Sequence, residues 1–291
     1  MSNVPSLVKN PYTKTVFKTD KELQDFIKCC DPNTGYLYFM DNFFIIQHPT
    51  KGSMVYHPWP YQKRLIETYH TYRYSISLMP RQSGKSTSAA GYLLWYAMFN
   101  PDSTILVAAH KYTGAQEIMQ RIRYAYENCP DYIKAGVTTY NKGSLDFENG
   151  SRIVSATTTE NTGRGMSITL LYLDEFAFVR PSIAKEFWTA ITPTLSTGGK
   201  AIITSTPNSD EDTFATIWKD ANKKFDEFGN EEPYIDRLKR TWMAKENTPV
   251  IFLSAEKKIN IAELRDTIKN MVMNVSGKTI HTLYDIQTED I

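Results

Sequence analysis

The stretch ISLMPRQSGKST, residues 76–87, constrains the fold of this chain more than any other. A short apolar run ends at Met79, and Gly84-Lys85-Ser86 then opens a segment, Ser86–Phe99, that is apolar nearly all round. A strand, a loop that ends in Gly-Lys-Ser and a buried helix together favour a phosphate-binding loop. The backbone N–H groups of such a loop, with the helix N-terminus, present positive charge to phosphates. Met79 nevertheless stands where the first glycine of this loop normally lies.

Composition narrows the class of protein. With 291 residues, of which 41% are hydrophobic, the chain can bury a substantial core as one large domain or two small ones. No stretch approaches the roughly 18 uninterrupted apolar residues of a membrane span, and the first residues lack the apolar core of a signal peptide. Cys29, Cys30 and Cys129 have no metal-ligand spacing. We therefore expect a cytoplasmic protein without a membrane partner. The net charge of +1 neither indicates nor excludes nucleic acid.

From about residue 58, apolar strands alternate with helices, which predicts an α/β fold with a mainly parallel central sheet flanked by helices. The first 55 residues instead hold aromatic runs between turn signals, which we interpret as a small β-rich flap. Asn149-Gly150 favours a hairpin between residues 145–147 and 152–157. The other expected strands are Tyr36–Met40, Phe43–Gln47, Ser75–Met79, Thr104–Ala109, Ile168–Leu173 and Ala201–Ser205. The expected helices are Ser86–Phe99, Thr113–Asn128, Ile183–Ile191 and Thr213–Asn222.

A pair of acidic residues ends the apolar run LLYLDEFAFV, residues 170–179, in a Walker B pattern. In a phosphate-loop site, Lys85 would contact the β- and γ-phosphates of ATP, while the Ser86 hydroxyl and Asp174 would hold Mg²⁺. Glu175 would polarise the attacking water, a role that simple nucleotide binding does not need. These residues predict ATP hydrolysis. The open alternatives are a surface Gly-Lys-Ser turn and an ordinary solvated strand end.

Several stretches of the chain resemble the ATPase half of the large terminase subunit of tailed bacteriophages. They are MPRQSGKST, ILVAAHK, YNKGSLDFENGSRI, GRGMS, LLYLDEFAFV and ITSTPN, which follow one another in the family's order over roughly residues 55–222. The similarity is closest to the version found in large contractile-tailed phages. In that family Arg-Gln precedes Gly-Lys-[Ser/Thr] and the first glycine is dispensable, so Met79 does not indicate a damaged site. The resemblance implies a P-loop NTPase of the additional-strand type.

The resemblance also assigns arginines to the site. Arg81, inside the loop, would bridge γ-phosphate oxygens with its planar donor fork and act as a finger in cis. Its alternative is a structural arginine that pairs with a surface acid. Arg164, on a glycine-flanked loop, is either a finger for a neighbouring subunit's ATP or an ordinary exposed arginine. The expected nucleotide-binding set is Gln62, Arg81, Gln82, Ser83, Gly84, Lys85, Ser86 and Thr87.

Two further motifs follow from the resemblance. Pro60-Tyr61-Gln62 looks like the family's adenine-binding motif, in which the Gln62 amide both donates and accepts hydrogen bonds; the alternative is a glutamine that begins an ordinary helix. Thr204, Ser205 and Thr206 look like the motif that couples hydrolysis to movement. Hydroxyls at such a strand end could sense the loss of the γ-phosphate, or could form a plain polar exit from the strand.

The sequence therefore predicts an ATP-hydrolysing motor subunit that packages viral double-stranded DNA. Subunits would assemble as a homo-oligomeric ring on a portal protein, with a small terminase subunit as a further partner. One alternative is a helicase-like, DNA-dependent ATPase unrelated to packaging. Another is a truncated, non-catalytic nucleotide-binding assembly factor. A GTPase is a third alternative, suggested only by the end of the chain.

The resemblance weakens after about residue 222, and we divide the chain into residues 1–55, 56–222, 223–247 and 248–291. A full-length large subunit continues into a second ATPase subdomain and a nuclease of the ribonuclease H fold. Residues 223–291 are too few for that nuclease, so we expect no nuclease activity. Residues 223–247 form a basic linker whose Arg237-Leu238-Lys239-Arg240 run could follow a DNA backbone or remain solvated. Residues 248–291 resemble the last strand and helix of a Ras-like GTPase domain, without its Asn-Lys-x-Asp motif.

Overall fold

The computed structural model describes residues 7–223 of the chain. The chain divides into two units, Met1–Ala221 and Asn222–Ile291, and the labelled helices and strands all belong to the first. Apart from residue 223, the expected basic linker at 223–247 and the Ras-like tail at 248–291 lie outside the described residues.

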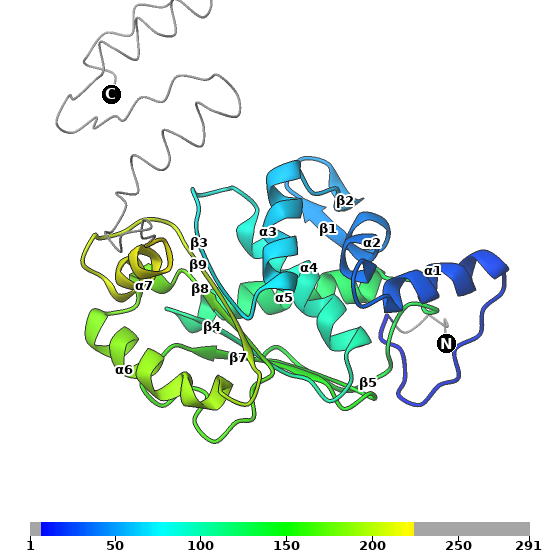
Figure 1. Ribbon diagram of the computed structural model, residues 1–291. Coiled ribbons are helices and arrows are strands. Elements are labelled where there is room, and N and C mark those ends of the chain that lie inside the picture. The colour runs from blue at the N-terminus through cyan, green and yellow to red at the C-terminus, as the bar shows by residue number, and fades with distance from the viewer. Residues whose placement is uncertain (1–6, 224–291) are drawn as a thin grey trace, which may run out of the picture. The chain divides into compact units, whose positions relative to one another are not determined.

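A seven-stranded sheet forms the centre of the first unit, with the strand order β3-β9-β8-β4-β7-β6-β5 (Figure 1). The strands from β3 to β7 in this order run parallel, and β6 and β5 continue the sheet antiparallel at one edge. This sheet confirms the predicted fold class. Its strands are β3 (Tyr74–Leu78), β4 (Thr104–Ala109), β5 (Val137–Tyr140), β6 (Ser144–Phe147), β7 (Arg152–Thr157), β8 (Leu170–Asp174) and β9 (Lys200–Ser205).

The position of β9 decides the type of P-loop fold. β9 pairs with β3, the strand before Gly-Lys-Ser, and also with β8, the strand that ends in Asp174. One strand therefore separates the phosphate loop from the acidic strand end, as the additional-strand arrangement requires. All three strands are parallel, so their carboxyl ends meet at the same edge of the sheet, where α/β proteins bind ligands.

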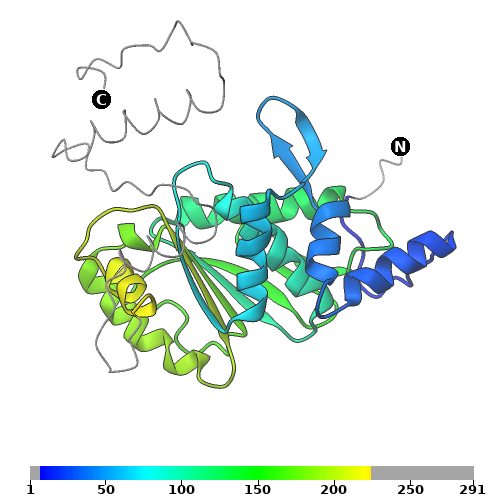
Figure 2. The ribbon, with the colours of Figure 1, turned by 45° about the horizontal axis from the view of Figure 1, so that its top comes forward.

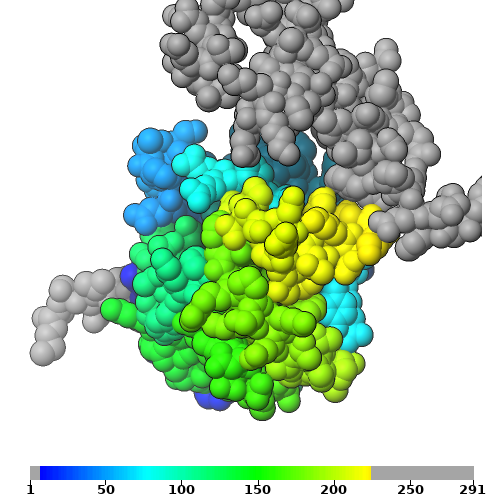
Figure 3. Space-filling model, turned by 90° about the vertical axis from the view of Figure 1, so that its left-hand side faces the viewer, coloured from blue at the N-terminus to red at the C-terminus, as the bar shows by residue number. Residues whose placement is uncertain are grey.

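Helices cover both faces of the sheet, and the strands are apolar on both faces for that reason. Ile105 and Val107 of β4 belong to the core under α3, α4 and α5, while Leu106 and Ala108 belong to the core under α6 and α7. Figure 3 shows the α6 and α7 side of this arrangement as a continuous surface. The helices are α3 (Pro60–Thr71), α4 (Lys85–Phe99), α5 (Tyr112–Asn128), α6 (Pro181–Ile191) and α7 (Thr213–Ala221).

Helix α4 has the environment that its composition predicts. Every residue from Ser88 to Trp95 is buried, because α4 contacts α2, α3, α5 and β4. A helix that is apolar all round needs such neighbours on every side. Within residues 7–223, no helix is both long and apolar enough to cross a membrane.

The N-terminal region differs from the expected β-rich flap. The strand expected at Tyr36–Met40 is wrong, since Gly35–Asn42 forms the helix α2, packed against α4 and against α1 (Asp20–Cys30). The buried side chains of α2 recur at the spacing of a helix and not of a strand: Tyr36, Phe39 and Met40. Only the two-stranded hairpin of β1 (Ile45–His48) and β2 (Gly52–Val55) matches the expectation, and it projects from the body in Figure 2.

Substitution of Phe39 tests whether the N-terminal helices share the main core. Its side chain is fully buried in the core that contains α4. Replacing Phe39 with Ala should lower the free energy of unfolding by roughly 3–5 kcal/mol, because truncation removes apolar contacts and leaves a cavity. Leu23→Ala, at a 39% exposed position of α1, should lower it by about 1 kcal/mol or less. Chemical denaturation of the full chain measures both values, and equal losses would contradict a shared core.

Candidate nucleotide-binding site

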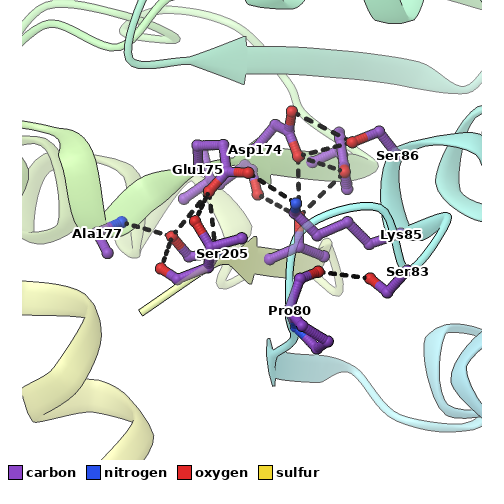
Figure 4. Close-up of polar contacts among 12 residues, drawn as sticks. Pro80, Ser83, Lys85, Ser86, Asp174, Glu175, Ala177 and Ser205 are labelled. Carbon is purple, nitrogen blue, oxygen red and sulfur yellow. Dashed lines mark hydrogen bonds and ion pairs between the residues drawn. The ribbon is translucent and has the colours of Figure 1, made fainter. Parts of the chain in front are cut away.

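The loop between β3 and α4 has the backbone of a phosphate-binding loop. Gly84 caps the N-terminus of α4 in the left-handed conformation, with φ +77°, and Gln82 also has a positive φ of +60°. Left-handed backbone suits glycine because other residues pay a steric cost there. The turn closes on itself where the Ser83 hydroxyl donates to the Pro80 carbonyl at 2.9 Å (Figure 4).

Two side chains of α3 hold this loop in place. The Gln62 amide donates from Nε2 to the Ser83 carbonyl at 3.0 Å, and the Tyr61 hydroxyl donates to the same carbonyl at 2.9 Å. Gln62 Oε1 accepts from the Trp59 N–H at 2.9 Å, so both ends of the amide are occupied and the residue is buried. In this structure Gln62 joins α3 to the loop. Its contact with adenine stays a prediction.

The two sequence motifs meet at the carboxyl edge of the sheet. Lys85 Nζ lies 2.7 Å from Glu175 Oε1, and the Ser86 hydroxyl donates to Asp174 Oδ1 at 3.3 Å. Figure 4 shows these four side chains facing one another, two from the start of α4, one from the last residue of β8 and one from the residue after it. The lysine side chain is 8% exposed and the glutamate side chain 23% exposed. The structure therefore brings together the four residues that the motifs predict for phosphate, metal and water.

The hydroxyls at the end of β9 contact the same two carboxylates. Thr204 Oγ1 donates to Asp174 Oδ1 at 3.1 Å. The Thr206 N–H and hydroxyl each donate to Glu175 Oε2 at 2.9 Å, and the Ser205 hydroxyl donates to that oxygen at 3.3 Å. The residues predicted to couple hydrolysis to movement thus hold the acids directly.

The two carboxylates have different electrostatic surroundings. Burial works to raise the pKa of Glu175, but the hydrogen bonds from Lys85 and Thr206 outweigh it and hold the pKa below its ordinary value. Burial raises the pKa of Asp174 above its ordinary value, although Tyr172, Lys85 and Thr204 oppose the shift. Glu175 is therefore an anion at neutral pH and can accept a proton or a hydrogen bond from water.

Glu175 also has a strained backbone, with φ +50° and ψ +46° in the left-handed region. A non-glycine residue in this region costs on the order of 1 kcal/mol or more. The hydrogen bonds from Ser205 and Thr206 fix the direction of the side chain.

Tyr172 is a site residue that was not predicted from the sequence. Its fully buried hydroxyl donates to Asp174 Oδ1 at 2.9 Å and lies 3.0 Å from Thr204 Oγ1. The available signal was the spacing, because residues two apart on a strand share a face of the sheet. A tyrosine two positions before a strand-end aspartate could therefore have been assigned to the site.

The two predicted arginine fingers are exposed. Among residues 7–223, neither the Arg81 nor the Arg164 guanidinium has a hydrogen-bond or ion-pair partner. Arg81 lies in the phosphate loop itself. Arg164 lies on the loop between β7 and β8 beside Gly163, which packs near Ile191 of α6. The structure does not bring Arg164 into contact with the Lys85–Glu175 pair, and a role for it in trans stays a prediction.

A cavity of about 870 Å³ adjoins the phosphate loop. Gln62, Gln82, Gly84 and Thr87 line its loop side, and the β1–β2 hairpin and α5 form its other walls. Its volume lies within the usual range for small-molecule sites, roughly 300–1,000 Å³. The cavity offers room for a nucleoside next to the loop that would hold its phosphates.

The oxygen donors of the site fit Mg²⁺. This ion prefers oxygen ligands and usually takes one or two from the protein together with substrate phosphates and waters. The Ser86 hydroxyl and the Asp174 carboxylate converge from α4 and β8, beside the loop. Among the described residues, Asp174 Oδ2 accepts a hydrogen bond only from Ser86, at 3.5 Å, which leaves lone pairs for a metal or its waters.

Comparison with known proteins gives the family. The model of the terminase large subunit, T4likevirus-type, N-terminal, matches residues 76–284. The chain belongs to this family, the N-terminal ATPase part of the large subunits that package phage DNA. The match includes the phosphate loop, both acids and β9.

The solved structure of the HK97 large terminase supports the fold of this terminase chain. The large terminase of bacteriophage HK97 is 20% identical with a TM-score of 0.54, over 82% of this chain and 51% of the HK97 chain. A mutant of the ATPase domain of the large terminase of Thermus phage P74-26 is 25% identical with a TM-score of 0.47, over 55% of this chain and 68% of that one. This chain thus matches about half of the length of the HK97 protein.

Substitution of Gly84 tests how closely Gln62 packs on the phosphate-binding loop. A Cβ at this position would lie 2.4 Å from Gln62 Nε2. Gly84→Ala should therefore move the loop and weaken ATP binding at least about ten-fold, beyond the effect of left-handed strain alone. Gly165→Ala is the matched control, because Gly165 also has a left-handed φ of +75° but no atom near its would-be Cβ. Calorimetric titration with ATP measures both variants, and an equal, small loss would contradict the close packing of Gln62 on the loop.

Proposed function

We propose that this terminase chain binds ATP with Mg²⁺ and hydrolyses it to drive the packaging of viral double-stranded DNA. The observation that carries the proposal is the Lys85–Glu175 and Ser86–Asp174 arrangement beside a phosphate-binding loop. A cation for phosphates, a hydroxyl and carboxylate for Mg²⁺ and an ionised glutamate for water are the parts that phosphoryl transfer requires. Mg²⁺ would supply charge neutralisation at the phosphates.

Lys85 and Glu175 form an ion pair in the structure, with Nζ 2.7 Å from Oε1. Phosphate oxygens of ATP would compete with Glu175 for the Lys85 ammonium, since both are anionic hydrogen-bond acceptors. When Lys85 contacts a phosphate instead, Glu175 Oε1 would have no partner, while Thr206 still donates to Glu175 Oε2. The freed Oε1 can then accept a hydrogen bond from the attacking water. Nucleotide binding and activation of the general base are thereby joined in one exchange of partners.

Arg81 and the cavity complete the nucleotide site. Arg81 is exposed on the loop and has no partner among residues 7–223, so its fork is available to γ-phosphate oxygens. The cavity that adjoins Gln62 and Gly84 would receive the nucleoside.

Membership of the terminase family supports the partners that we propose. The proposed partners are double-stranded DNA, the portal protein and the small terminase subunit. Copies of the chain would assemble as a ring on the portal, in the host cytoplasm. In such a ring, the exposed Arg164 would enter the site of a neighbouring subunit.

Steady-state hydrolysis tests the proposal. The full chain is assayed with ATP and with GTP, alone, with double-stranded DNA, and with the portal protein and small subunit. The proposal expects ATP turnover that requires Glu175 and rises with DNA or portal. Equal turnover of GTP would favour a GTPase, and stimulation by DNA but not by portal would favour a helicase-like enzyme. Nucleotide binding without turnover in every condition would contradict hydrolysis and favour an assembly factor.

Glu175→Gln separates binding from chemistry. The substitution should abolish turnover and tighten ATP binding by about two- to five-fold, because the partly buried ion pair that competes for Lys85 is worth up to about 1 kcal/mol. Glu186→Gln, which neutralises an exposed carboxylate of α6, should change neither property. Fluorescent-nucleotide titration gives the affinity, and weaker binding by Glu175→Gln would contradict the proposed competition.

A further inference from the structure

The two oxygens of the Asp174 carboxylate accept different numbers of hydrogen bonds. Its Oδ1 accepts hydrogen bonds from Tyr172 at 2.9 Å, Thr204 at 3.1 Å and Ser86 at 3.3 Å. Its Oδ2 accepts, among the described residues, only from Ser86 at 3.5 Å. One oxygen is thus anchored to the protein while the other keeps its lone pairs.

The anchor consists of two hydroxyls from adjacent strands. Tyr172 of β8 and Thr204 of β9 are both fully buried, and their oxygens lie 3.0 Å apart. Thr204 is also the register partner of Asp174 across the β8–β9 ladder. The backbone pairing of the sheet therefore sets where both hydroxyls meet Oδ1.

We infer that Tyr172 and Thr204 are positioning residues that fix the Asp174 carboxylate with Oδ2 toward the Mg²⁺ of the bound nucleotide, and so set the metal affinity of the site. The inference rests on the proposed function. It gives Tyr172 a role that sequence motifs do not assign. It also gives Thr204 a role other than phosphate sensing, since its buried hydroxyl is directed to Asp174.

The physical need for such an anchor lies in the aspartate side chain. Rotation of the carboxylate about its terminal torsion has a broad, nearly two-fold profile, so that torsion alone does not select which oxygen faces a ligand. Two donors on Oδ1 select one orientation and keep it before metal arrives. Partners that orient metal ligands in this way typically contribute roughly 10–100-fold in metal affinity.

The alternative explanation is that Tyr172 only stabilises the fold. Buried tyrosines usually find a hydrogen-bond partner, and Asp174 could serve as that partner with no consequence for the metal. Tyr126 provides a matched case, because its fully buried hydroxyl donates to the Ala135 carbonyl at 2.7 Å. Removal of either phenolic hydroxyl takes away buried hydrogen bonding, but only the Tyr172 hydroxyl contacts residues of the site.

The test is a metal titration of the full chain bound to a non-hydrolysable ATP analogue, with Mn²⁺ followed by electron paramagnetic resonance and Mg²⁺ by competition. Tyr172→Phe and Thr204→Val should each weaken metal binding by about ten-fold. Thr204→Ser, which keeps the hydroxyl, should restore it to within about two-fold of the original chain, and Tyr126→Phe should leave it unchanged. Affinity for the analogue in EDTA should be the same in all five proteins.

The outcomes separate this inference from the proposed function. Metal affinity in Tyr172→Phe and Thr204→Val equal to that of the original chain would overturn the inference. Absence of any metal-dependent nucleotide binding by the original chain would instead overturn the proposed function. If near-ultraviolet circular dichroism shows that Tyr172→Phe does not fold, the comparison of Thr204→Val with Thr204→Ser decides the inference alone.

Discussion

The ion pair between Lys85 and Glu175 joins the two halves of the site. One partner comes from the first residue of α4 and the other from the residue after β8, and Nζ lies 2.7 Å from Oε1. Both positions depend on left-handed backbone, which most residues adopt only at a cost. It occurs at Gly84, just before Lys85, and at Glu175 itself. The Gln62 amide holds the loop side of the pair, and the Thr206 N–H and hydroxyl hold the acid side.

Strand β9 connects these parts because it lies between β3 and β8. The hydroxyls at its end and on the next residue divide between the acids. Thr204 donates to Asp174, while Ser205 and Thr206 donate to Glu175. The Ser205 carbonyl also accepts from the Met79 N–H at the start of the loop, at 3.0 Å. A change of partner at Glu175 therefore reaches both the loop and the end of β9.

The same contacts lead away from the site. The Ser205 hydroxyl accepts from the Ala177 N–H at 3.2 Å, within the short turn Phe176–Phe178, and the Asn208 amide donates to the Ala177 carbonyl at 3.1 Å. That turn contacts α7. These hydrogen bonds connect Glu175, which would exchange partners during hydrolysis, to helix α7. They give a physical route by which hydrolysis could switch the helix between two positions.

The sequence was sufficient for the strands of the central sheet other than β5 (Val137–Tyr140), and for the acids. Parallel strands buried on both faces are continuous apolar runs, so β4, β8 and β9 stood out, and residues at their carboxyl ends could be placed together. It was insufficient for α2, where an aromatic run fits either a strand or a buried helix until its neighbours are known. The role of Gln62 could not be seen either, because the carbonyl that it holds lies 21 residues away. Tyr172 was overlooked although its spacing from Asp174 was visible.

A structure of the full chain with a non-hydrolysable ATP analogue and Mg²⁺ would show whether nucleotide takes Lys85 away from Glu175. We expect Lys85 Nζ to leave Glu175 Oε1 for a phosphate oxygen, while Thr206 keeps Glu175 Oε2 and the nucleoside occupies the cavity beside Gly84. An intact Lys85–Glu175 pair, with the nucleotide bound at this loop or elsewhere, would show that this exchange does not occur.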